Sequence, residues 1–354
     1  MRKPIALVLT GVLSLAMSVT AFAGTAQGTA MPDGASGEII EISTAEELAA
    51  VNENLSGNYI LTADIDLEGE EWTPLGAFVP ASMEGEEAEI PGEEYAFTGT
   101  FDGNGHTINN LVVNQPEAYT LGLFGCIANA DVGNFTVENA SADGIMMVSD
   151  VVGHSFCSLV HDINLIEGTV NAHVSEEMEE AAEGMYGGIV GAGLGSQIVN
   201  CSASAAIILP DGLANAGIIG GGLQGTSVIG CSATGTVTAG DNCYGLGGIS
   251  GCGFGAEEFF DDTASDVTIT CGDDCFWIGG ITGYAGGYED ETLGTPVTVF
   301  TNCTTSGVEI NTGANADGVG DIVGSGFYSE EYAQEMGEPF DKPTLYELVD
   351  CGVV

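Results

Sequence analysis

The ten cysteines are the residues of this chain best suited to covalent chemistry. Cys201 and Cys231 open two similar phrases, CSASAAI and CSATGTV, and Cys243 and Cys275 are matched in the same way. Equivalent residues of stacked strands lie about 4.8 Å apart, a separation that a disulfide accepts. Side chains in a parallel ladder point in the same direction, which favours a stack of thiols. We therefore expect a buried thiol stack at Cys201 and Cys231, and leave either a disulfide or a thiol pair open at Cys243 and Cys275. Cys243, Cys252, Cys271 and Cys275 also supply the ligand count of a zinc site, a weaker alternative because they lack paired C-x2-C spacing.

Aspartates in two matched turns form a candidate metal site. The phrases TVTAGDNCYGLGGI and TITCGDDCFWIGGI superimpose without a gap, so Asp241 should lie over Asp273 and Asn242 over Asp274. Carboxylates one coil apart repel each other unless they are hydrated or share a cation, and Ca²⁺ prefers oxygen ligands. Asp241, Asp273 and Asp274 are therefore candidate calcium ligands, and a hydrated acidic turn is the alternative. We expect no other cofactor.

Catalytic residues are harder to identify. Paired carboxylates can hydrolyse glycosidic bonds, and Asp261 with Asp262, or Asp64 with Asp66, offer such pairs. Neighbours on one strand face opposite sides, however, and 52 acidic residues produce adjacent pairs by chance. The four histidines are scattered along the chain. We therefore expect no catalytic set, and keep a carbohydrate-active β-helix hydrolase acting on a neutral polysaccharide as the alternative function.

Charge restricts the possible partners. The chain has 52 acidic residues against three Lys and Arg together, and a formal net charge of −49 at pH 7. Such a surface repels nucleic acids and anionic lipid head groups, so we expect neither as a partner. Lys342 is followed by Pro343, so the chain beyond its first residues offers trypsin essentially no bond to cleave. Protease resistance and drift towards a soluble surface both explain this composition, and both stay open.

The first residues have the pattern of a secretory signal peptide. Arg2 and Lys3 precede an apolar run, and Ala21-Phe22-Ala23 has the small residues of a cleavage site, which predicts a signal peptide over 1–23. No later stretch reaches the ~20 apolar residues of a spanning helix. We expect a protein that is exported, soluble and not inserted in a membrane, either secreted or associated with the cell surface.

From residue 121 onward the chain repeats. Seven phrases end in glycine and carry an apolar residue at their centre, with intervals of roughly 30 residues lengthened in two places by loop-like inserts. The phrases are LGLFG (121–125), SDVVG (149–153), GGIVG (187–191), AGIIG (216–220), GGISG (247–251), GGITG (279–283) and GDIVG (320–324). Short β-branched strands between glycine turns at this period predict one solenoid coil per repeat, stacked so that each strand pairs with its equivalent in the next coil.

The segments around the repeats complete the predicted fold. Residues 24–38 are small and polar, which indicates a flexible leader, and Ser43 with Glu46 fits a capping box that opens a short helix. The polar, partly helical pattern of 327–354 suggests a C-terminal cap over the open end of the stack. We predict an all-β protein, a right-handed parallel β-helix over 39–326 with a helical N-terminal cap.

These residues also resemble a known family. YILTADIDL followed by WTPLG, FTGTFDGNGHTINNLVV and LGLFG resembles the N-terminal coil of secreted bacterial proteins with GLUG-type repeats, and GGIVG with IVNCSASA resembles the repeat itself. The resemblance covers about residues 55–325. It implies a right-handed parallel β-helix on an exported, adhesin-like surface protein, without assigned catalytic residues. We expect a non-enzymatic extracellular structural or interaction protein that binds a protein, a glycan or a cation through its acidic surface.

Overall fold

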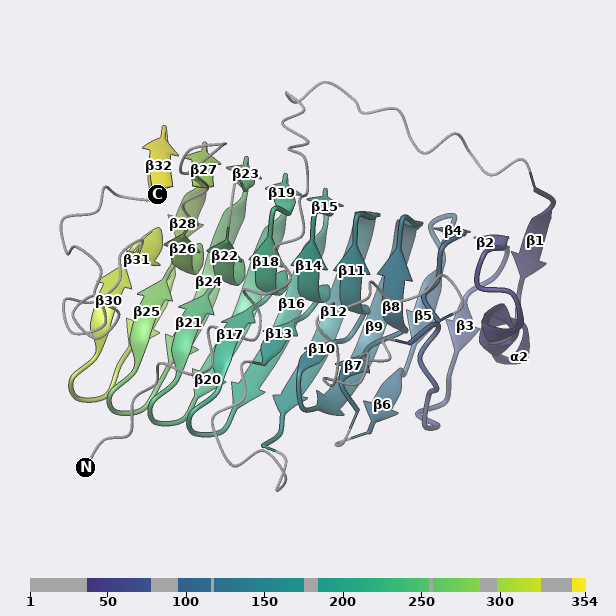
Figure 1. The fold of residues 1–354 in the computed structure, drawn as a ribbon, viewed down its shortest axis with the longest axis horizontal. Coiled ribbons are helices and arrows are strands. Elements are labelled where there is room, and N and C mark those ends of the chain that lie inside the picture. The colour runs from purple at the N-terminus through teal and green to yellow at the C-terminus, as the bar shows by residue number, and fades with distance from the viewer. Residues whose placement is uncertain are drawn as a thin grey trace, which may run out of the picture.

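The computed structural model describes residues 37–77, 95–115, 118–174, 184–254, 257–286, 298–325 and 346–354. The expected signal peptide, nearly all of the leader and residues 327–345 of the expected C-terminal cap lie outside this part. The described chain is all-β apart from a short helical segment, and its coils stack into a rod (Figure 1). The expectation of a parallel β-helix is confirmed, because the strand pairs in the described part of the chain are parallel. Its right-handed sense stays a prediction.

Three parallel sheets run along the rod. Sheet B contains β8 (Phe124–Ala128), β11 (Val152–Phe156), β14 (Val190–Leu194), β18 (Gly220–Gln224), β22 (Ser250–Phe254), β26 (Thr282–Gly286) and β31 (Val323–Ser325). Sheet C contains β7 (Thr120–Leu121), β10 (Met147–Ser149), β13 (Met185–Gly187), β17 (Ala214–Gly217), β21 (Tyr244–Gly247), β25 (Phe276–Gly279) and β30 (Asp317–Gly320).

Sheet A, the largest, includes both the N-terminal coils and one wall of every later coil. Its strands are β1 (Ile39–Ile42), β2 (Asn58–Leu61), β3 (Ile65–Asp66), β4 (Thr100–Asp102), β5 (Thr107–Asn109), β6 (Val112–Asn114), β9 (Asp131–Gly144), β12 (Leu159–Ala172), β15 (Gln197–Val199), β16 (Ser202–Leu209), β19 (Ser227–Ile229), β20 (Ser232–Ala239), β23 (Glu258–Phe260), β24 (Thr263–Thr270), β27 (Thr298–Thr301), β28 (Thr304–Ser306), β29 (Glu309–Asn311), β32 (Tyr346–Val349) and β33 (Gly352–Val353).

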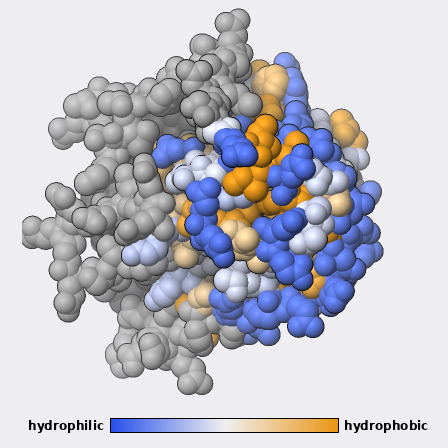
Figure 2. Space-filling view, turned by 90° about the vertical axis from the view of Figure 1, so that its right-hand side faces the viewer, coloured by the Kyte–Doolittle hydropathy of each residue, from blue (hydrophilic) through white to orange (hydrophobic). Residues whose placement is uncertain are grey.

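The N-terminal end carries the only α-helix of the described residues. Helix α2 (Ala45–Ala49) continues into the 3₁₀ helix η2 (Ala50–Glu53), close to the predicted helix. The predicted capping box is displaced by one residue, because Thr44 Oγ1 accepts from the backbone N–H of Glu47 and the Glu47 carboxylate accepts from Ser43. Strand β1 pairs with β2, and Figure 2, which looks onto this end, shows apolar atoms at the centre of a hydrophilic rim.

The repeat phrases lie at the corner between sheets C and B. Their central residues form one inward-facing column of seven apolar side chains, all fully buried except Ile322, which is 8% exposed. One phrase was misaligned in the sequence: Gly217 pairs with Gly247 and Gly220 with Ser250, so Ile219 occupies the column and not Ile218. Both isoleucines are buried, so hydrophobicity alone could not distinguish the two registers.

The glycines of the phrases are required by close backbone contacts. A Cβ at Gly247 would lie 2.0 Å from the carbonyl oxygen of Ser250, across the corner. A Cβ at Gly251 would lie 2.3 Å from the backbone nitrogen of Ala216, on the strand of the preceding coil. Real Cβ atoms do not tolerate such distances, so larger residues would force sheets B and C apart. The recurrence of glycine in the repeat phrases is therefore explained by the close backbone packing at this corner.

The rod continues beyond the last complete coil. Strands β32 and β33 lie within the expected C-terminal cap and pair in parallel with β27 and β28, so they extend sheet A where a partly helical pattern was expected. Within the described part of the chain, no helix is long and apolar enough to cross a membrane.

Candidate functional site

The predicted aspartate turns form a regular ladder along the rod. Asp241 and Asp273 occupy equivalent positions of successive coils, as expected from their matched phrases. The Oδ1 atom of Asp241 accepts from the backbone N–H of Asp273 at 2.8 Å, and Asp273 Oδ1 accepts from that of Ala314 at 2.7 Å. One coil earlier, Asp211 Oδ1 accepts from the backbone N–H of Asp241 at 2.9 Å. We call Asp211, Asp241 and Asp273 the aspartate ladder.

Glycine makes room for each carboxylate of the ladder. A Cβ at Gly272 would lie 2.0 Å from Asp241 Oδ1, and one at Gly240 would lie 2.1 Å from Asp211 Oδ1. The next residue of each turn, Asn242 or Asp274, has a φ of 57°. Asn and Asp tolerate this left-handed conformation better than other non-glycine residues. The structure of the turn thus explains the residue type at each position of the GDN and GDD phrases.

The ladder does not resemble a built calcium site. Asp241 and Asp273 each direct one carboxylate oxygen at a backbone N–H group, which partly compensates their charge without a cation. Asp274 Oδ1 instead accepts from Asn315 Nδ2 at 3.2 Å. In the residues that the structure describes, no group of three or more His, Cys, Asp or Glu side chains converges as a metal site. Calcium binding by Asp241, Asp273 and Asp274 stays a prediction, and we derive no chemistry from it.

The matched cysteines face the core. Cys201 and Cys231 are both 1% exposed and in register, because the residues that follow them, Ser202 and Ser232, pair across β16 and β20. Each thiol donates to the carbonyl oxygen two residues earlier in its own strand end. The structure holds these two cysteines as free thiols, which agrees with the expected stack.

Cys243 and Cys275 are likewise in register, fully buried and free thiols in the structure. The thiol of Cys275 donates to Gly240 O at 3.2 Å and that of Cys243 to Pro210 O at 3.2 Å. A disulfide between the two stays a prediction. The zinc alternative with Cys252 and Cys271 gains no support from the described residues, where no such cluster converges.

A buried carboxyl group interrupts the column of thiols that Cys201 and Cys231 begin. In the next coil the equivalent position holds Asp262, which is 0% exposed, and then the column continues with Cys303. Asp262 Oδ1 accepts from the backbone N–H of Cys231 at 2.7 Å, while its Oδ2 atom has no hydrogen-bond partner. Burial raises the pKa of Asp262 well above its ordinary value. Nothing in the sequence distinguished Asp262 from its exposed neighbour Asp261.

Neither carboxylate pair proposed for hydrolysis has catalytic geometry. Asp261 is exposed and accepts from Asn302 Nδ2 at 2.9 Å, on the side opposite to Asp262. Asp64 accepts from His106 and from the backbone N–H of Thr107, and these hydrogen bonds lower its pKa. Hydrogen bonds also lower the pKa of Asp66, so neither suits the general acid that a glycosidase needs.

His161 acts as a local cation beside two aspartates. His161 lies between Asp131, whose Oδ1 is 2.9 Å from Nε2, and Asp162, whose Oδ2 is 2.7 Å from Nδ1. These hydrogen bonds raise the pKa of His161 to about 9, so the ring is charged at neutral pH. His173 contacts Asp143 in a similar way. His154 is different, because burial lowers its pKa to about 4.

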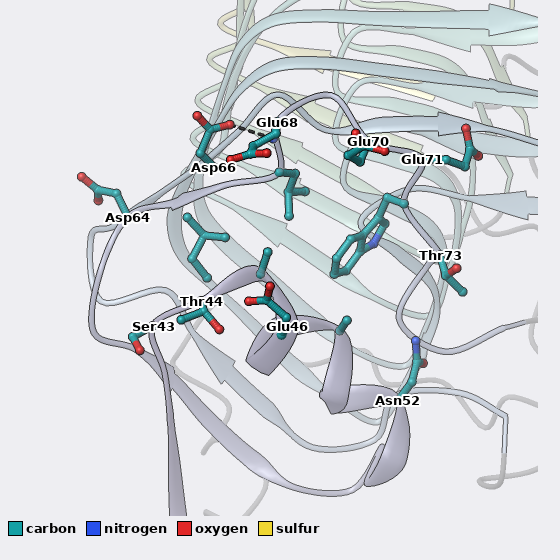
Figure 3. Close-up of a pocket in the computed structure, with 15 residues that line it drawn as sticks. Ser43, Thr44, Glu46, Asn52, Asp64, Asp66, Glu68, Glu70, Glu71 and Thr73 are labelled. Carbon is teal, nitrogen blue, oxygen red and sulfur yellow. Dashed lines mark hydrogen bonds between the residues drawn. The ribbon is translucent and has the colours of Figure 1, made fainter.

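A hollow in the described surface lies beside the N-terminal helix. Its volume is about 770 Å³, and Figure 3 shows carboxylates on both sides: Glu46 on α2, and Asp66, Glu68, Glu70 and Glu71 on the facing chain. With Asp64, all six of these acidic residues are exposed. We call this the acidic hollow.

The floor of the acidic hollow is apolar and fixed. Ile65, Leu67 and Trp72 line it and are 2%, 5% and 7% exposed. The indole N–H of Trp72 donates to Leu123 O at 3.1 Å, which holds the ring in place. The carboxylate of Glu71 accepts from the backbone N–H of Asn114 at 2.9 Å. Lys and Arg are absent from the described residues, so no such side chain there offsets the charge.

The acidic hollow was not predicted from the sequence. Asp64 and Asp66 were considered only as a hydrolase pair, although the signal was the series Asp64, Asp66, Glu68 and Glu70, with an acidic residue at every second position. Alternation along an extended chain places such residues on one face, away from the buried ones between them. The contribution of Glu46 could not be foreseen, because it depends on where the helix packs.

The comparisons with known proteins are limited in extent. No family model matches the chain. Halomucin from Haloquadratum walsbyi (strain DSM 16790 / HBSQ001) is 31% identical over 161 residues, which are 43% of this chain and 2% of halomucin. The chain therefore corresponds to a very small part of that relative.

Two solved structures are similar over most of the chain at low identity. An IgA1 Protease structure is 14% identical, with a TM-score of 0.47, and covers 87% of this chain and 21% of its own. L. reuteri 53608 SRRP is 13% identical, with a TM-score of 0.24, and covers 79% of this chain and 99% of its own. Both TM-scores are below 0.5, so the fold assignment depends on the strand pairing of this chain itself.

Proposed function

We propose that the chain is a non-enzymatic, exported interaction protein whose acidic β-helix surface binds a partner outside the cell. The acidic hollow is the observation that carries this proposal. It combines six exposed carboxylates with an apolar floor, and the described residues contain no Lys or Arg to pair with them. Such a site attracts a cationic group attached to an apolar stem, as in a Lys- or Arg-containing segment of a protein.

Export and the repeat family are part of the same proposal. The signal-peptide pattern of 1–23 supports export, either into the medium or to the cell surface. The phrases that resemble GLUG-type repeats support an adhesin-like surface protein. The similarity to part of halomucin is compatible with a repeated extracellular module.

The hydrolase alternative has less support. Neither of the two carboxylate pairs that motivated it is suited to hydrolysis. Asp262 faces the core, away from Asp261, and hydrogen bonds lower the pKa of both Asp64 and Asp66. The recurring glycines and turn aspartates are engaged in backbone contacts. A glycan as a bound, uncleaved ligand is a possible outcome of the test below.

The test is a binding assay with the protein purified without residues 1–23. Poly-L-lysine and neutral polysaccharides are immobilised separately, and retention is measured at low and at high salt. The hollow variant carries Glu46→Gln, Glu68→Gln and Glu70→Gln, whose side chains line the acidic hollow. A matched variant carries Glu38→Gln, Glu309→Gln and Glu347→Gln, three exposed residues elsewhere, and has the same net charge.

We expect the hollow variant to bind poly-L-lysine about tenfold more weakly, since loss of about 1.4 kcal/mol over three ion pairs has that effect. The matched variant should bind within about twofold of the wild type. Equal weakening of both variants would show that only overall charge matters, and would reject the acidic hollow as the site. Retention on a neutral polysaccharide that neither variant changes would assign the ligand to another face.

A further inference from the structure

Asp317 and Gly318 form an Asp-Gly pair in β30, the last strand of sheet C among the described residues. Asp317 donates its backbone N–H to Cys275 O of the preceding coil at 3.1 Å. Successive N–H groups of a strand point to opposite sides, so the N–H of Gly318 points away from β25, where the described sheet has no further strand. It donates instead to the side chain of its own neighbour, Asp317 Oδ1, at 2.8 Å.

Similar pairs in earlier coils are held differently. The N–H of Gly212, which follows Asp211, donates to Asp241 O of the next coil at 2.8 Å. In the phrase DGNG (102–105), both glycine N–H groups likewise donate to carbonyl oxygens of the next coil, at 2.8 Å each. Of these four pairs of Asp or Asn with glycine, the pair in β30 differs, because its glycine nitrogen is directed at the carboxyl group that precedes it.

We propose that Asp317 is a modification site, at which the chain rearranges spontaneously from an aspartyl to an isoaspartyl linkage. The nitrogen of Gly318 attacks Cγ of Asp317. The new N–Cγ bond closes a succinimide ring, the bond from Cγ to one oxygen breaks, and this oxygen leaves as water with the proton of the nitrogen. Water then adds to the α-carbonyl carbon of Asp317, and the bond from that carbon to the nitrogen breaks. One water is released and one is taken up, so the reaction needs no oxidant or reductant and leaves the mass unchanged.

The surroundings of this pair favour the reaction over the pair at Asp211. Asp317 is exposed, so water reaches it, and Gly318 has no Cβ to obstruct the approach of its nitrogen to the carboxyl group. The nitrogen of Gly212, in contrast, must first lose its hydrogen bond to Asp241 O. The carboxylate of Asp211 is also engaged, because its Oδ1 accepts from the backbone N–H of Asp241 at 2.9 Å.

The modification changes the last described strand of sheet C. An isoaspartyl linkage adds one carbon to the main chain, so Gly320, which pairs with Gly279, is displaced along β30. The corner that follows has little room for a displaced chain, since a Cβ at Gly320 would lie 2.1 Å from Val323 O. We therefore expect the modified β30 to separate from β25, and the melting temperature of the modified protein to be lower.

The modification can be detected with a protease that cleaves before aspartate and not before isoaspartate. The purified protein is incubated at neutral pH, and samples are digested at intervals. Aspartate at 317 gives the fragments 290–316 and 317–320, whereas isoaspartate gives the joined fragment 290–320. Isoaspartate at 211 gives the joined fragment 162–240, which serves as the matched internal control. We expect 290–320 to accumulate about tenfold faster, the factor that one hydrogen bond between coils provides. No accumulation of 290–320, or equal accumulation of both, would overturn the proposal.

Two further measurements separate the fold from the local sequence. In denaturant both pairs lose their contacts between coils, so the two joined fragments should accumulate at similar rates. A lead of 290–320 that persists in denaturant would assign the effect to the local sequence and reject the structural account. Labelling by an isoaspartyl methyltransferase should rise during native incubation in the wild type and stay low in Asp317→Glu, which keeps the charge but needs a larger ring. An equal rise in both proteins would place the modification elsewhere.

Discussion

The Oδ1 atom of Asp241 accepts a hydrogen bond of 2.8 Å from the backbone N–H of Asp273, its equivalent one coil further along the rod. The same relationship recurs elsewhere, since Asp64 accepts from the backbone of Thr107 and Glu71 from that of Asn114. Backbone N–H groups thus compensate carboxylates in a chain that has almost no Lys or Arg. Carboxylates that would otherwise repel one another between coils therefore help to hold neighbouring coils together.

The aspartate ladder can be tested with one position. Asp241→Ala removes the acceptor for Asp273 N–H, and we expect the free energy of unfolding to fall by about 1–2 kcal/mol, measured by denaturant unfolding. Asp241→Asn keeps an acceptor oxygen and should cost less than half as much as the alanine variant. Equal losses in the two variants would show that the charge, rather than the hydrogen bond, provides the stability.

The same variants test whether Ca²⁺ binds at these turns. The ladder geometry predicts that the melting temperature is the same with Ca²⁺ and with a chelator, because the carboxylates already accept N–H groups. A drop on chelation in the wild type that Asp241→Asn abolishes would instead assign calcium to these turns.

His161 should make stability depend on pH in the alkaline range. Its pKa is raised in the folded protein from the ordinary value of 6.5 to about 9, first of all by the hydrogen bond to Asp131. The stabilisation is complete below about pH 6.5, where His161 is charged in both states, and is lost as pH rises through about 9. Unfolding measured between pH 6 and 10 should show this loss in the wild type and not in His161→Gln. A loss of the same size in His161→Gln would assign it to other groups.

Asp262 should make stability fall as pH rises, which is opposite to the effect of a carboxylate whose pKa is lowered by folding. Burial raises its pKa, so the folded state favours the protonated acid while the unfolded chain is ionised. Stability is highest below the unfolded pKa near 4 and falls with rising pH, by about 1.4 kcal/mol per pH unit, until the folded group also ionises. We expect Asp262→Asn, which keeps an acceptor for Cys231 N–H, to flatten this dependence. Asp261→Asn, at the exposed neighbour, should leave it intact.

The glycine contacts predict a sharp difference between two substitutions of the same kind. Gly251→Ala places a Cβ 2.3 Å from the backbone nitrogen of Ala216, whereas a Cβ at Gly352 has nothing within 4 Å. We expect Gly251→Ala to cost at least about 2 kcal/mol of stability, because backbone atoms must move, and Gly352→Ala to cost less than about 0.5 kcal/mol. Comparable melting temperatures for the two variants would contradict a close contact between sheets B and C.

Much of the architecture could be predicted because the fold repeats. Glycine phrases at a regular period, with one apolar residue at each centre, define the coil and the inward column. The exception at Ile218 and Ile219 shows the limit, since two adjacent buried residues of the same type fit either register. The pairing of β32 and β33 with sheet A depends on distant strands and left no local signal.

The site was less predictable for a physical reason. Turn residues such as Asp241 and Asn242 are specified by local backbone conformation, so their alignment could be read from the phrases. The acidic hollow depends on how helix α2 packs beside the chain from Asp64 to Thr73, which is a tertiary relationship. The burial of Asp262 could not be foreseen, because its coil position, between Cys231 and Cys303, matters more than its polarity.

The most direct test of the account is to measure retention and released reducing ends together, for the purified wild type on immobilised poly-L-lysine and on a panel of neutral polysaccharides. We expect salt-sensitive retention on poly-L-lysine that the Glu46, Glu68 and Glu70 triple variant weakens, and no released ends on any polysaccharide. Released ends on any polysaccharide would contradict a non-enzymatic interaction protein.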